Sequence, residues 1–215
     1  MNFNAVIFDL DGTLLDSMYI WDTLAEDYLK SVGVEAKPGL CDAVNTLMME
    51  DAAVYLKEEY TLPYPTEKIL EDIFSIVDDF YFNSTLLKDG VFEFLNLLKI
   101  SGIKMCIATA SERYVVEAAL KRCKAYDFFD RIFTCSEVGH SKTEPDIFFE
   151  AAKFLEEQPK DILVFEDALF AAQTAKSAGF KVCGVYDQSE KHTEKLRITA
   201  DYYINSFKEA GAIID

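Results

Sequence analysis

The sequence predicts an α/β fold, a doubly wound, Rossmann-like parallel sheet with an inserted α-helical domain. Three observations predict it. Residues 5–8 form an apolar run that ends in closely spaced aspartates, residues 16–86 contain amphipathic segments without a strong strand candidate, and from about residue 89 apolar runs alternate with helical patterns. Strands that alternate with helices make right-handed crossovers, so we expect one parallel sheet covered by helices on both faces.

The length of 215 residues allows one full α/β core and a smaller accessory domain, but not two large domains. We expect residues 1–15 and 87–215 to form the core and residues 16–86 to form a helical cap domain, with hinges near residues 15–18 and 83–88. Half of the residues are hydrophobic and 13% are aromatic, which is typical of a globular chain with a substantial core.

The chain is strongly acidic, with a formal net charge of −17. Nucleic acids and anionic membrane surfaces attract basic proteins, so we expect neither as a partner. The same charge repels a phosphorylated small molecule at long range. A phosphate site in this chain must therefore depend on local lysine, backbone N–H groups and a metal ion.

Cysteine usage and hydropathy bear on the compartment. The five cysteines are scattered and odd in number, and they include no Cys-x-x-Cys pair, which favours a reduced compartment. No basic segment followed by a long apolar stretch marks the N-terminus, and no run approaches the roughly 20 apolar residues of a membrane helix. We expect a cytoplasmic protein that is a monomer or a weak dimer.

The first predicted strand, Ala5–Phe8, is entirely apolar and half β-branched, as expected of a buried strand. It is followed by Asp9, Asp11 and Gly12, a residue type that permits a sharp change of direction. Neighbouring buried carboxylates cost several kcal/mol unless a cation or hydrogen bonds offset them, so the pair suggests a divalent metal and phosphate chemistry. The alternative is an ordinary Asp-Gly turn in which Asp11 caps the next segment.

The remaining elements follow from periodicity and breakers. The inserted segment contains three amphipathic stretches, Ile20–Val32, Ala43–Tyr60 and Thr66–Phe82, and a proline-containing break at residues 61–66 separates the last two. Beyond it we predict a helix that begins at residue 91 and ends at residues 101–102, helices over residues 112–124 and 146–156, and an alanine-rich helix that ends at residues 178–179. We predict strands over residues 103–108, 131–134, 161–165, 182–185 and, at an edge, 202–204.

Polar clusters follow successive predicted strands. They are Thr109-Ala110-Ser111, His140-Ser141-Lys142 and Glu166-Asp167. Ligands bind outside the carboxyl ends of parallel strands, so these clusters should meet the aspartates of the first strand at one edge. Each has a simpler interpretation: a helix N-cap for Thr109 or Ser111, a solvated charge for Lys142, and favourable placement at a helix start for Glu166-Asp167. We leave His140 out as a loop residue. The joint occurrence favours a functional site.

With these residues at the ends of its predicted strands, the chain resembles the haloacid dehalogenase (HAD) superfamily of phosphotransferases. Within it, the chain is similar to the subgroup with a helical cap, which includes β-phosphoglucomutase and many small phosphatases. Asp9-Leu10-Asp11-Gly12-Thr13 matches the first family motif, DxDGT, which is specific. Thr109 matches the hydroxyl of the second motif, Lys142 with Pro145-Asp146 resembles the third, and Glu166-Asp167 resembles the fourth. The resemblance covers essentially the whole chain, cap included.

The chain also departs from the family pattern. Thr143 replaces the first proline of the usual K-P-x-P-D, and Ala168 and Ala171 replace the serine and glycine of the usual E-D-S-x-x-G. Asp89-Gly90 stands where Pro-Gly is common. None of these departures removes a residue with a chemical role.

The resemblance implies a reaction. Asp9 would be the nucleophile that forms an aspartyl-phosphate, and Asp11 the general acid and then the general base. Thr109, the Ala110 N–H and Lys142 would bind the oxygens of the transferring phosphoryl group.

The resemblance also implies Mg²⁺ as cofactor. The ion would be held by Asp9, the backbone carbonyl of Asp11 and Asp167, with Glu166 binding directly or through water. The substrate would be a small phosphorylated metabolite, and the cap would select it. Tyr19, Trp21, Met48 and Met49 are candidate substrate contacts, with ordinary packing between cap helices as the alternative.

Three functions remain open on the sequence. The first is a Mg²⁺-dependent phosphatase acting on a sugar phosphate or similar monoester. The second is a phosphomutase of the β-phosphoglucomutase type, which the scarcity of basic residues around positions 45–55 disfavours, since Lys57 is the one cation between Lys37 and Lys68. The third is a phospho-accepting signalling or regulatory domain, and the motif order and the inserted cap argue against a signalling receiver. The sequence does not identify the substrate.

Overall fold

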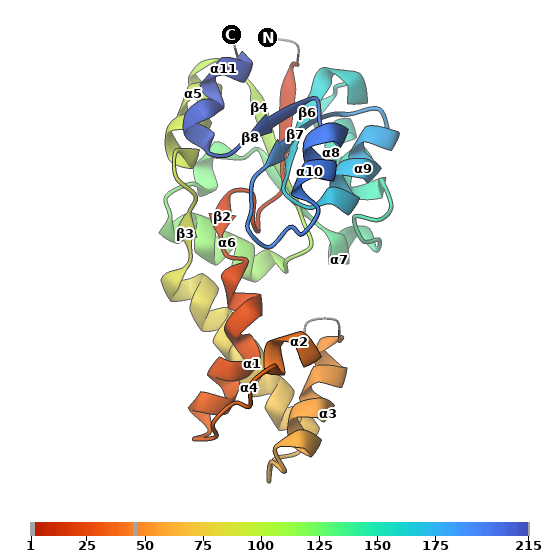
Figure 1. The fold of residues 1–215 in the computed structure, drawn as a ribbon. Helices are drawn as coiled ribbons and strands as arrows, with labels where there is room; N and C mark the ends of the chain where they lie inside the picture. Colours follow the sequence, from red (N-terminus) through yellow and green to blue (C-terminus); the bar gives the residue numbers. More distant parts are fainter. Residues whose placement is uncertain (1–2, 45–46, 215) are drawn as a thin grey trace. The chain divides into compact units, whose positions relative to one another are not determined.

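The computed structural model describes residues 3–44 and 47–214, apart from the side chains of residues 42 and 214. The part of the predicted helix 43–60 that falls on residues 45–46 lies outside the described residues. The chain divides into two compact units, Met1–Ser17 with Thr85–Asp215, and Met18–Ser84. Figure 1 shows the helices and strands of both units.

A six-stranded parallel sheet forms the centre of the larger unit, in the order β5-β4-β1-β6-β7-β8 (Figure 1). Its strands are β1 Ala5–Phe8, β4 Lys104–Thr109, β5 Arg131–Thr134, β6 Ile162–Glu166, β7 Lys181–Val185 and β8 Tyr202–Ile204. The chain moves outward from β1 to β5 on one side and from β6 to β8 on the other. This confirms the predicted doubly wound α/β fold, including the edge strand at residues 202–204.

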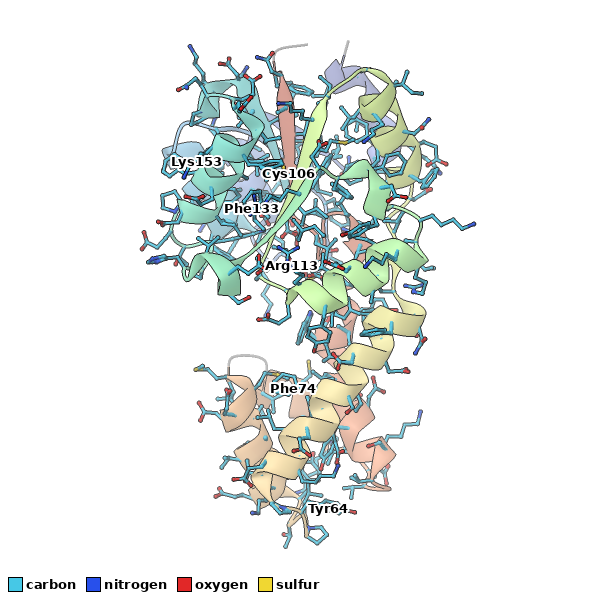
Figure 2. All side chains as sticks on the ribbon, turned by 180° about the vertical axis from the view of Figure 1, so that it is seen from behind. Tyr64, Phe74, Cys106, Arg113, Phe133 and Lys153 are labelled. Atoms are coloured by element: carbon cyan, nitrogen blue, oxygen red, sulfur yellow. The ribbon has the colours of Figure 1, made fainter. Side chains whose placement is uncertain are left out.

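Helices cover both faces of this sheet. They are α5 Val91–Ile100, α6 Arg113–Arg122, α7 Cys135–Val138, α8 Asp146–Leu155, α9 Leu169–Ser177, α10 Thr193–Thr199 and α11 Gly211–Ile214. On one face, α8 and α9 pack on a cluster that includes Ile7, Cys106 and Phe133, while Lys153 lies on the exposed side of α8 (Figure 2). On the other face, Phe8 stacks on Phe165 with ring centroids 4.9 Å apart.

The register of the sheet decides which side chains meet at its carboxyl edge. Phe8 lies opposite Ile107 of β4 on one side and Phe165 of β6 on the other. Asp9 therefore follows its strand level with the last residues of both neighbouring strands. Below this edge, the aromatic rings of Phe8 in β1, Phe165 in β6 and Phe94 in α5 pack together and bury a large apolar area.

Several short elements were not predicted. β2, Leu15–Asp16, pairs antiparallel with β3, Leu86–Leu87, to form a separate two-stranded sheet at the two ends of the inserted segment. The helices α7, α10 and α11 were also missed. Each of these elements is shorter than the periodic pattern on which a prediction depends.

The smaller unit is helical, with α1 Tyr19–Ser31, α2 Leu40–Val44, α3 Met49–Glu59, α4 Thr66–Asp79 and a π-helical turn at Phe80–Ser84. The predicted stretch 43–60 corresponds to the end of α2 and the separate helix α3. Tyr28, Leu56 and Ile69 are buried among these helices, whereas Tyr64 and Phe74 lie on the outside (Figure 2). Among the described residues, no helix has both the length and the apolar character needed to cross a membrane.

Candidate functional site

Asp9 lies directly after β1, in the centre of the sheet edge. Its backbone N–H donates to the carbonyl of Phe165 at 2.9 Å, which continues the pairing with β6 by one residue. Its side chain is buried, with 7% of the residue exposed. Asp9 takes this position because it is the first polar residue after β1, an apolar strand that is buried on both faces.

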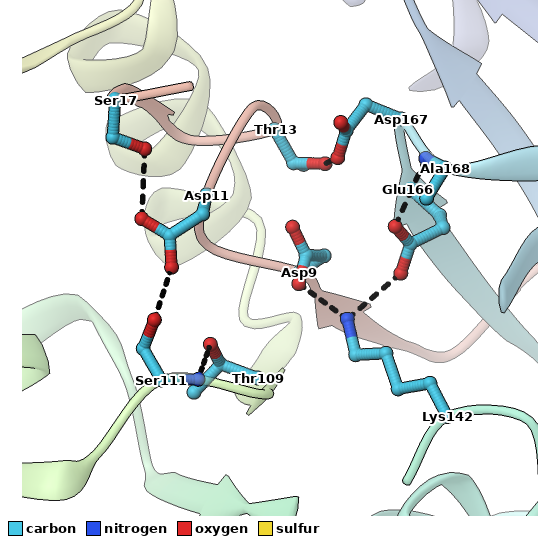
Figure 3. Close-up of polar contacts among 10 residues, drawn as sticks. All are labelled: Asp9, Asp11, Thr13, Ser17, Thr109, Ser111, Lys142, Glu166, Asp167 and Ala168. Atoms are coloured by element: carbon cyan, nitrogen blue, oxygen red, sulfur yellow. Dashed lines mark hydrogen bonds and ion pairs between the residues drawn. The ribbon is translucent and has the colours of Figure 1, made fainter. Parts of the chain in front are cut away.

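Lys142 reaches the same point from the loop between α7 and α8. Its ammonium forms ion pairs with Asp9 Oδ1 and with Glu166 Oε2, the latter at 2.8 Å (Figure 3). The lysine is 5% exposed, so this is a buried network and not a solvated surface charge. The alternative interpretation of Lys142 as a surface residue is wrong.

Three buried carboxylates converge here. The nearest oxygens of Asp9, Glu166 and Asp167 all lie within 4.8 Å of one another. Glu166 Oε1 accepts the backbone N–H of Ala168 at 3.1 Å, and Asp167 Oδ1 accepts the hydroxyl of Thr13 at 2.9 Å. Together, the three carboxylates and the ammonium of Lys142 carry a formal charge of −2.

Burial and this excess of negative charge together change the pKa values of the carboxylates. Burial, followed by the charge of Glu166, raises the pKa of Asp9 to about 6, although Lys142 acts in the opposite direction. Burial, followed by the charges of Asp9 and Glu166, also raises the pKa of Asp167 well above its usual value. A divalent cation would balance the charge of −2, and carboxylate oxygens are the ligands that hard divalent cations prefer. The residues present therefore fit such an ion.

Asp11 occupies a different environment. One carboxylate oxygen accepts the Ser17 hydroxyl at 2.7 Å and the other accepts the Ser111 hydroxyl at 2.6 Å (Figure 3). The carboxylate is thus held by two neutral donors, while Asp9 is held by a lysine. Gly12, which follows, has φ of 79°, so the backbone turns sharply after Asp11 as the sequence predicts.

Thr109 and Ser111 follow the neighbouring strand. Thr109 is the last residue of β4 and is fully buried, and its hydroxyl oxygen accepts the N–H of Ser111 at 3.0 Å. Ala110 lies between them and is exposed. The N-cap position of α6 is Glu112, so the alternative role of Thr109 or Ser111 as the N-cap is wrong. These residues instead connect the end of β4 to Asp11.

The structure therefore brings together Asp9, Lys142, Glu166 and Asp167, and joins Asp11 to the Thr109 loop through Ser111 (Figure 3). The sequence-based site did not include Thr13, Ser17 or Ser111 as contacts. Thr13 and Ser111 stand inside motifs that were identified, so their positions gave a signal. Ser17 gave none, because its contact depends on the turn at Gly12.

The profile of a family described as haloacid dehalogenase-like hydrolase matches residues 6–185.

Two relatives match nearly end to end. Hexitol phosphatase B of Escherichia coli K12 is 26% identical over 97% of this chain and 94% of its own length. A phosphoglycolate phosphatase of Nitrosospira multiformis is 28% identical over 98% and 95%. A third relative, the bifunctional riboflavin kinase/FMN phosphatase of Arabidopsis thaliana, is 29% identical over 94% of this chain, which spans 53% of that protein.

Solved structures share the fold. A putative β-phosphoglucomutase from Thermotoga maritima superposes with a TM-score of 0.88 at 22% identity, covering 99% of this chain and 98% of that one. A predicted phosphoglycolate phosphatase from Haemophilus somnus gives 0.81 at 19% identity, covering 100% and 99%. At these identities the likeness establishes the arrangement of the backbone, with no conclusion about substrate.

Proposed function

This chain belongs to the haloacid dehalogenase-like hydrolases, and on that basis we propose that it is a Mg²⁺-dependent phosphatase that hydrolyses a small phosphomonoester through an aspartyl-phosphate on Asp9. The observation that carries the proposal is the buried cluster of Asp9, Glu166, Asp167 and Lys142 at the edge of the sheet. Family membership argues against the alternative of a signalling or regulatory domain.

Asp9 is the proposed nucleophile. One of its oxygens attacks phosphorus while the bond from phosphorus to the ester oxygen breaks, leaving a phosphoryl group on Asp9 and an alkoxide. Asp11 donates a proton to that alkoxide. Water then attacks phosphorus as Asp11 removes its proton, which releases inorganic phosphate and regenerates the Asp9 carboxylate. Asp11 must therefore change its protonation state once in each half-reaction.

The remaining residues position and neutralise charge. Lys142, the Thr109 hydroxyl and the Ala110 N–H are proposed to bind phosphoryl oxygens, whose negative charge they stabilise in the transition state. When Asp9 binds a phosphoryl group, Lys142 is already adjacent to the reacting carboxylate, because the two form an ion pair. This arrangement needs no large movement of the lysine.

Mg²⁺ is the proposed cofactor. Asp9, Asp167 and the Asp11 carbonyl would hold the ion, with Glu166 directly or through water. Bound there, it supplies the positive charge that lets a carboxylate approach an anionic phosphate. Both oxygens of Glu166 already accept hydrogen bonds, one from Lys142 and one from the Ala168 N–H, which favours contact through water.

The smaller unit, Met18–Ser84, is proposed to act as the cap that selects the substrate. Tyr19, Trp21 and Met48 carry exposed side chains in that unit and remain candidates for contact with the leaving group. The relatives are named for a hexitol phosphate, phosphoglycolate and FMN, which supports a small metabolite as the class of substrate. The phosphomutase alternative stays disfavoured on the scarcity of basic residues near Lys57.

Phosphate release from a panel of phosphomonoesters tests the proposal. The wild-type protein should hydrolyse at least one of them with Mg²⁺, and should not do so with EDTA or after Asp9→Asn. Circular dichroism should show that the variant is folded. Hydrolysis that continues in EDTA would contradict the metal requirement, and hydrolysis by Asp9→Asn would contradict the nucleophile.

A further inference from the structure

A second, partly buried lysine lies at the same edge of the sheet, outside the cluster of Asp9, Glu166, Asp167 and Lys142. Lys88 follows β3, and its ammonium donates hydrogen bonds to the carbonyl of Gly12 and, at 2.8 Å, to that of Tyr186. It also forms an ion pair with Asp187 Oδ2 at 2.7 Å. One ammonium group therefore joins the loop after β1, the loop after β7 and the start of the segment that leads to α5.

This contact joins a partly buried lysine to a buried carboxylate, and both groups have partners. The Lys88 side chain is 16% exposed and that of Asp187 is 5% exposed. The second oxygen of Asp187 accepts the N–H and the hydroxyl of Ser189, at 2.9 and 2.6 Å. Burial alone would raise the pKa of Asp187, but the hydrogen bonds from Lys88 and Ser189 lower it, so the carboxylate is ionised. The three donors of the ammonium match three acceptors.

The Gly12 carbonyl lies in the turn that connects the proposed reacting residues to Thr13. It belongs to the peptide group that joins Gly12 to Thr13, and the Thr13 hydroxyl donates to Asp167. On the other side of Gly12, Asp11 carries the proposed acid and base, and Asp9 lies three residues before Gly12. Lys88 thus holds one side of a turn whose other contacts orient the residues proposed to react. A charge-assisted hydrogen bond to a carbonyl, partly shielded from solvent, restricts that turn.

We propose that Lys88 is a positioning residue for the reaction: by binding the Gly12 carbonyl it fixes the turn that carries Asp9 and Asp11, while Asp187 balances its charge. The expected fall in kcat rests on the proposed function, whereas the restriction of the turn by Lys88 does not depend on it. Lys88 touches no reacting atom, so it acts through the backbone of the turn.

A paired substitution separates positioning from charge balance. Lys88→Met removes the ammonium and leaves Asp187 as a buried, unpaired carboxylate, so this variant should lose both thermal stability and activity. Lys88→Met combined with Asp187→Asn removes both charges. This double variant should recover most of the melting temperature, yet its kcat for p-nitrophenyl phosphate should stay roughly 10- to 100-fold below wild type with KM little changed.

Hydrogen–deuterium exchange reports on the turn without any substrate. The amides of Asp9, Gly12, Leu14 and Leu15 are hydrogen bonded to backbone carbonyls. In the double variant, peptides covering residues 9–15 should exchange faster than in wild type, while those from β7 and β8 should not change. Lys208→Met is the matched control, because Lys208 forms an exposed ion pair with Asp89 at 2.5 Å, one residue from Lys88 in the sequence.

The outcomes are distinct. Wild-type kcat and wild-type exchange of residues 9–15 in the double variant would overturn the proposal and leave Lys88 as a partner of Asp187 alone. If the double variant does not fold, the single variant Asp187→Asn tests the proposal instead. It keeps the bond from Lys88 to the Gly12 carbonyl, so the amides of residues 9–15 should exchange as they do in wild type. Faster exchange there would overturn the proposal. A wild-type protein without phosphatase activity would contradict the proposed function, and the exchange experiment would still test the role of Lys88.

Discussion

The hydroxyl of Ser111 donates a hydrogen bond of 2.6 Å to the carboxylate of Asp11, although the two residues are 100 positions apart in the sequence. The bond joins the turn after β1 to the loop after β4, at the point where the register places both strand ends side by side. Asp11 is the proposed acid and base, so its orientation depends on a residue from another strand. The Ser17 hydroxyl, at 2.7 Å, holds the second oxygen.

Ser111→Ala tests this orientation. A hydrogen bond to a charged group contributes about 1.5–3 kcal/mol, so losing it in a site that requires Asp11 in place should lower kcat roughly 10- to 100-fold. The effect should appear in kcat more than in KM, because the binding residues remain. Steady-state hydrolysis measures both. Ser177→Ala, an exposed serine on α9, serves as the control. Equal kinetics in the two variants would contradict the role of Ser111.

Removing Lys142 should destabilise the fold as well as abolish activity. Lys142→Met leaves Asp9 and Glu166 buried without their cation, and breaking a buried ion pair by removing one partner costs about 3–5 kcal/mol. Urea unfolding at neutral pH measures this loss. Lys153→Met, on the exposed side of α8, should change the free energy of unfolding by less than about 0.5 kcal/mol. A stable Lys142→Met protein would show that the buried carboxylates bind protons at little cost.

The raised pKa of Asp9 predicts a pH dependence of stability without metal. The folded protein holds a proton on Asp9 up to about pH 6, whereas the unfolded chain releases it near 3.8. Between these values the folded state binds more protons, so this group makes the protein less stable as pH rises, by about 3 kcal/mol over the whole window. In EDTA, the unfolding free energy of wild type should therefore fall relative to that of Asp9→Asn as the pH rises from 4 to 6.5. A constant difference would contradict the raised pKa.

Addition of Mg²⁺ should restore the stability that the metal-free protein loses as the pH rises. An ion that binds the folded state stabilises it by about 2.7 kcal/mol at a concentration 100 times its Kd. The melting temperature of wild type at pH 7 should therefore rise with Mg²⁺ concentration. The rise should be much smaller in Asp167→Asn, which removes one of the three clustered carboxylates. Glu194→Gln, at an exposed carboxylate, is the matched control. A full response in Asp167→Asn would place the ion elsewhere.

Much of the sheet follows from the sequence, because long apolar runs and their breakers determine it. Ala5–Phe8 has no polar residue and could only be buried, and the strand at residues 202–204 was correctly placed at an edge. The short pair of β2 and β3 could not be predicted, since two residues carry no periodicity. Its pairing depends instead on the two ends of the inserted segment meeting.

The site divides in the same way. Asp9, Lys142, Glu166 and Asp167 could be predicted because each stands just after a strand or before a helix, and parallel strands bring those positions together. The bond between Lys88 and Gly12 could not, since it spans 76 positions and needs the turn to form first. Ser17 was missed for the same reason. Sequence patterns identify which strands converge, but contacts between loops depend on how each turn folds.

The central claim is that Asp9 accepts the phosphoryl group. The most direct measurement is peptide mass spectrometry after acid quench of Asp11→Asn mixed with p-nitrophenyl phosphate and Mg²⁺. The p-nitrophenolate leaving group needs little help from a general acid, so the first step proceeds in this variant, whereas attack by water is slowed because the base is missing. We predict one phosphoryl group on the peptide that contains residue 9. Turnover without any covalent adduct, or an adduct on another residue, would contradict the account.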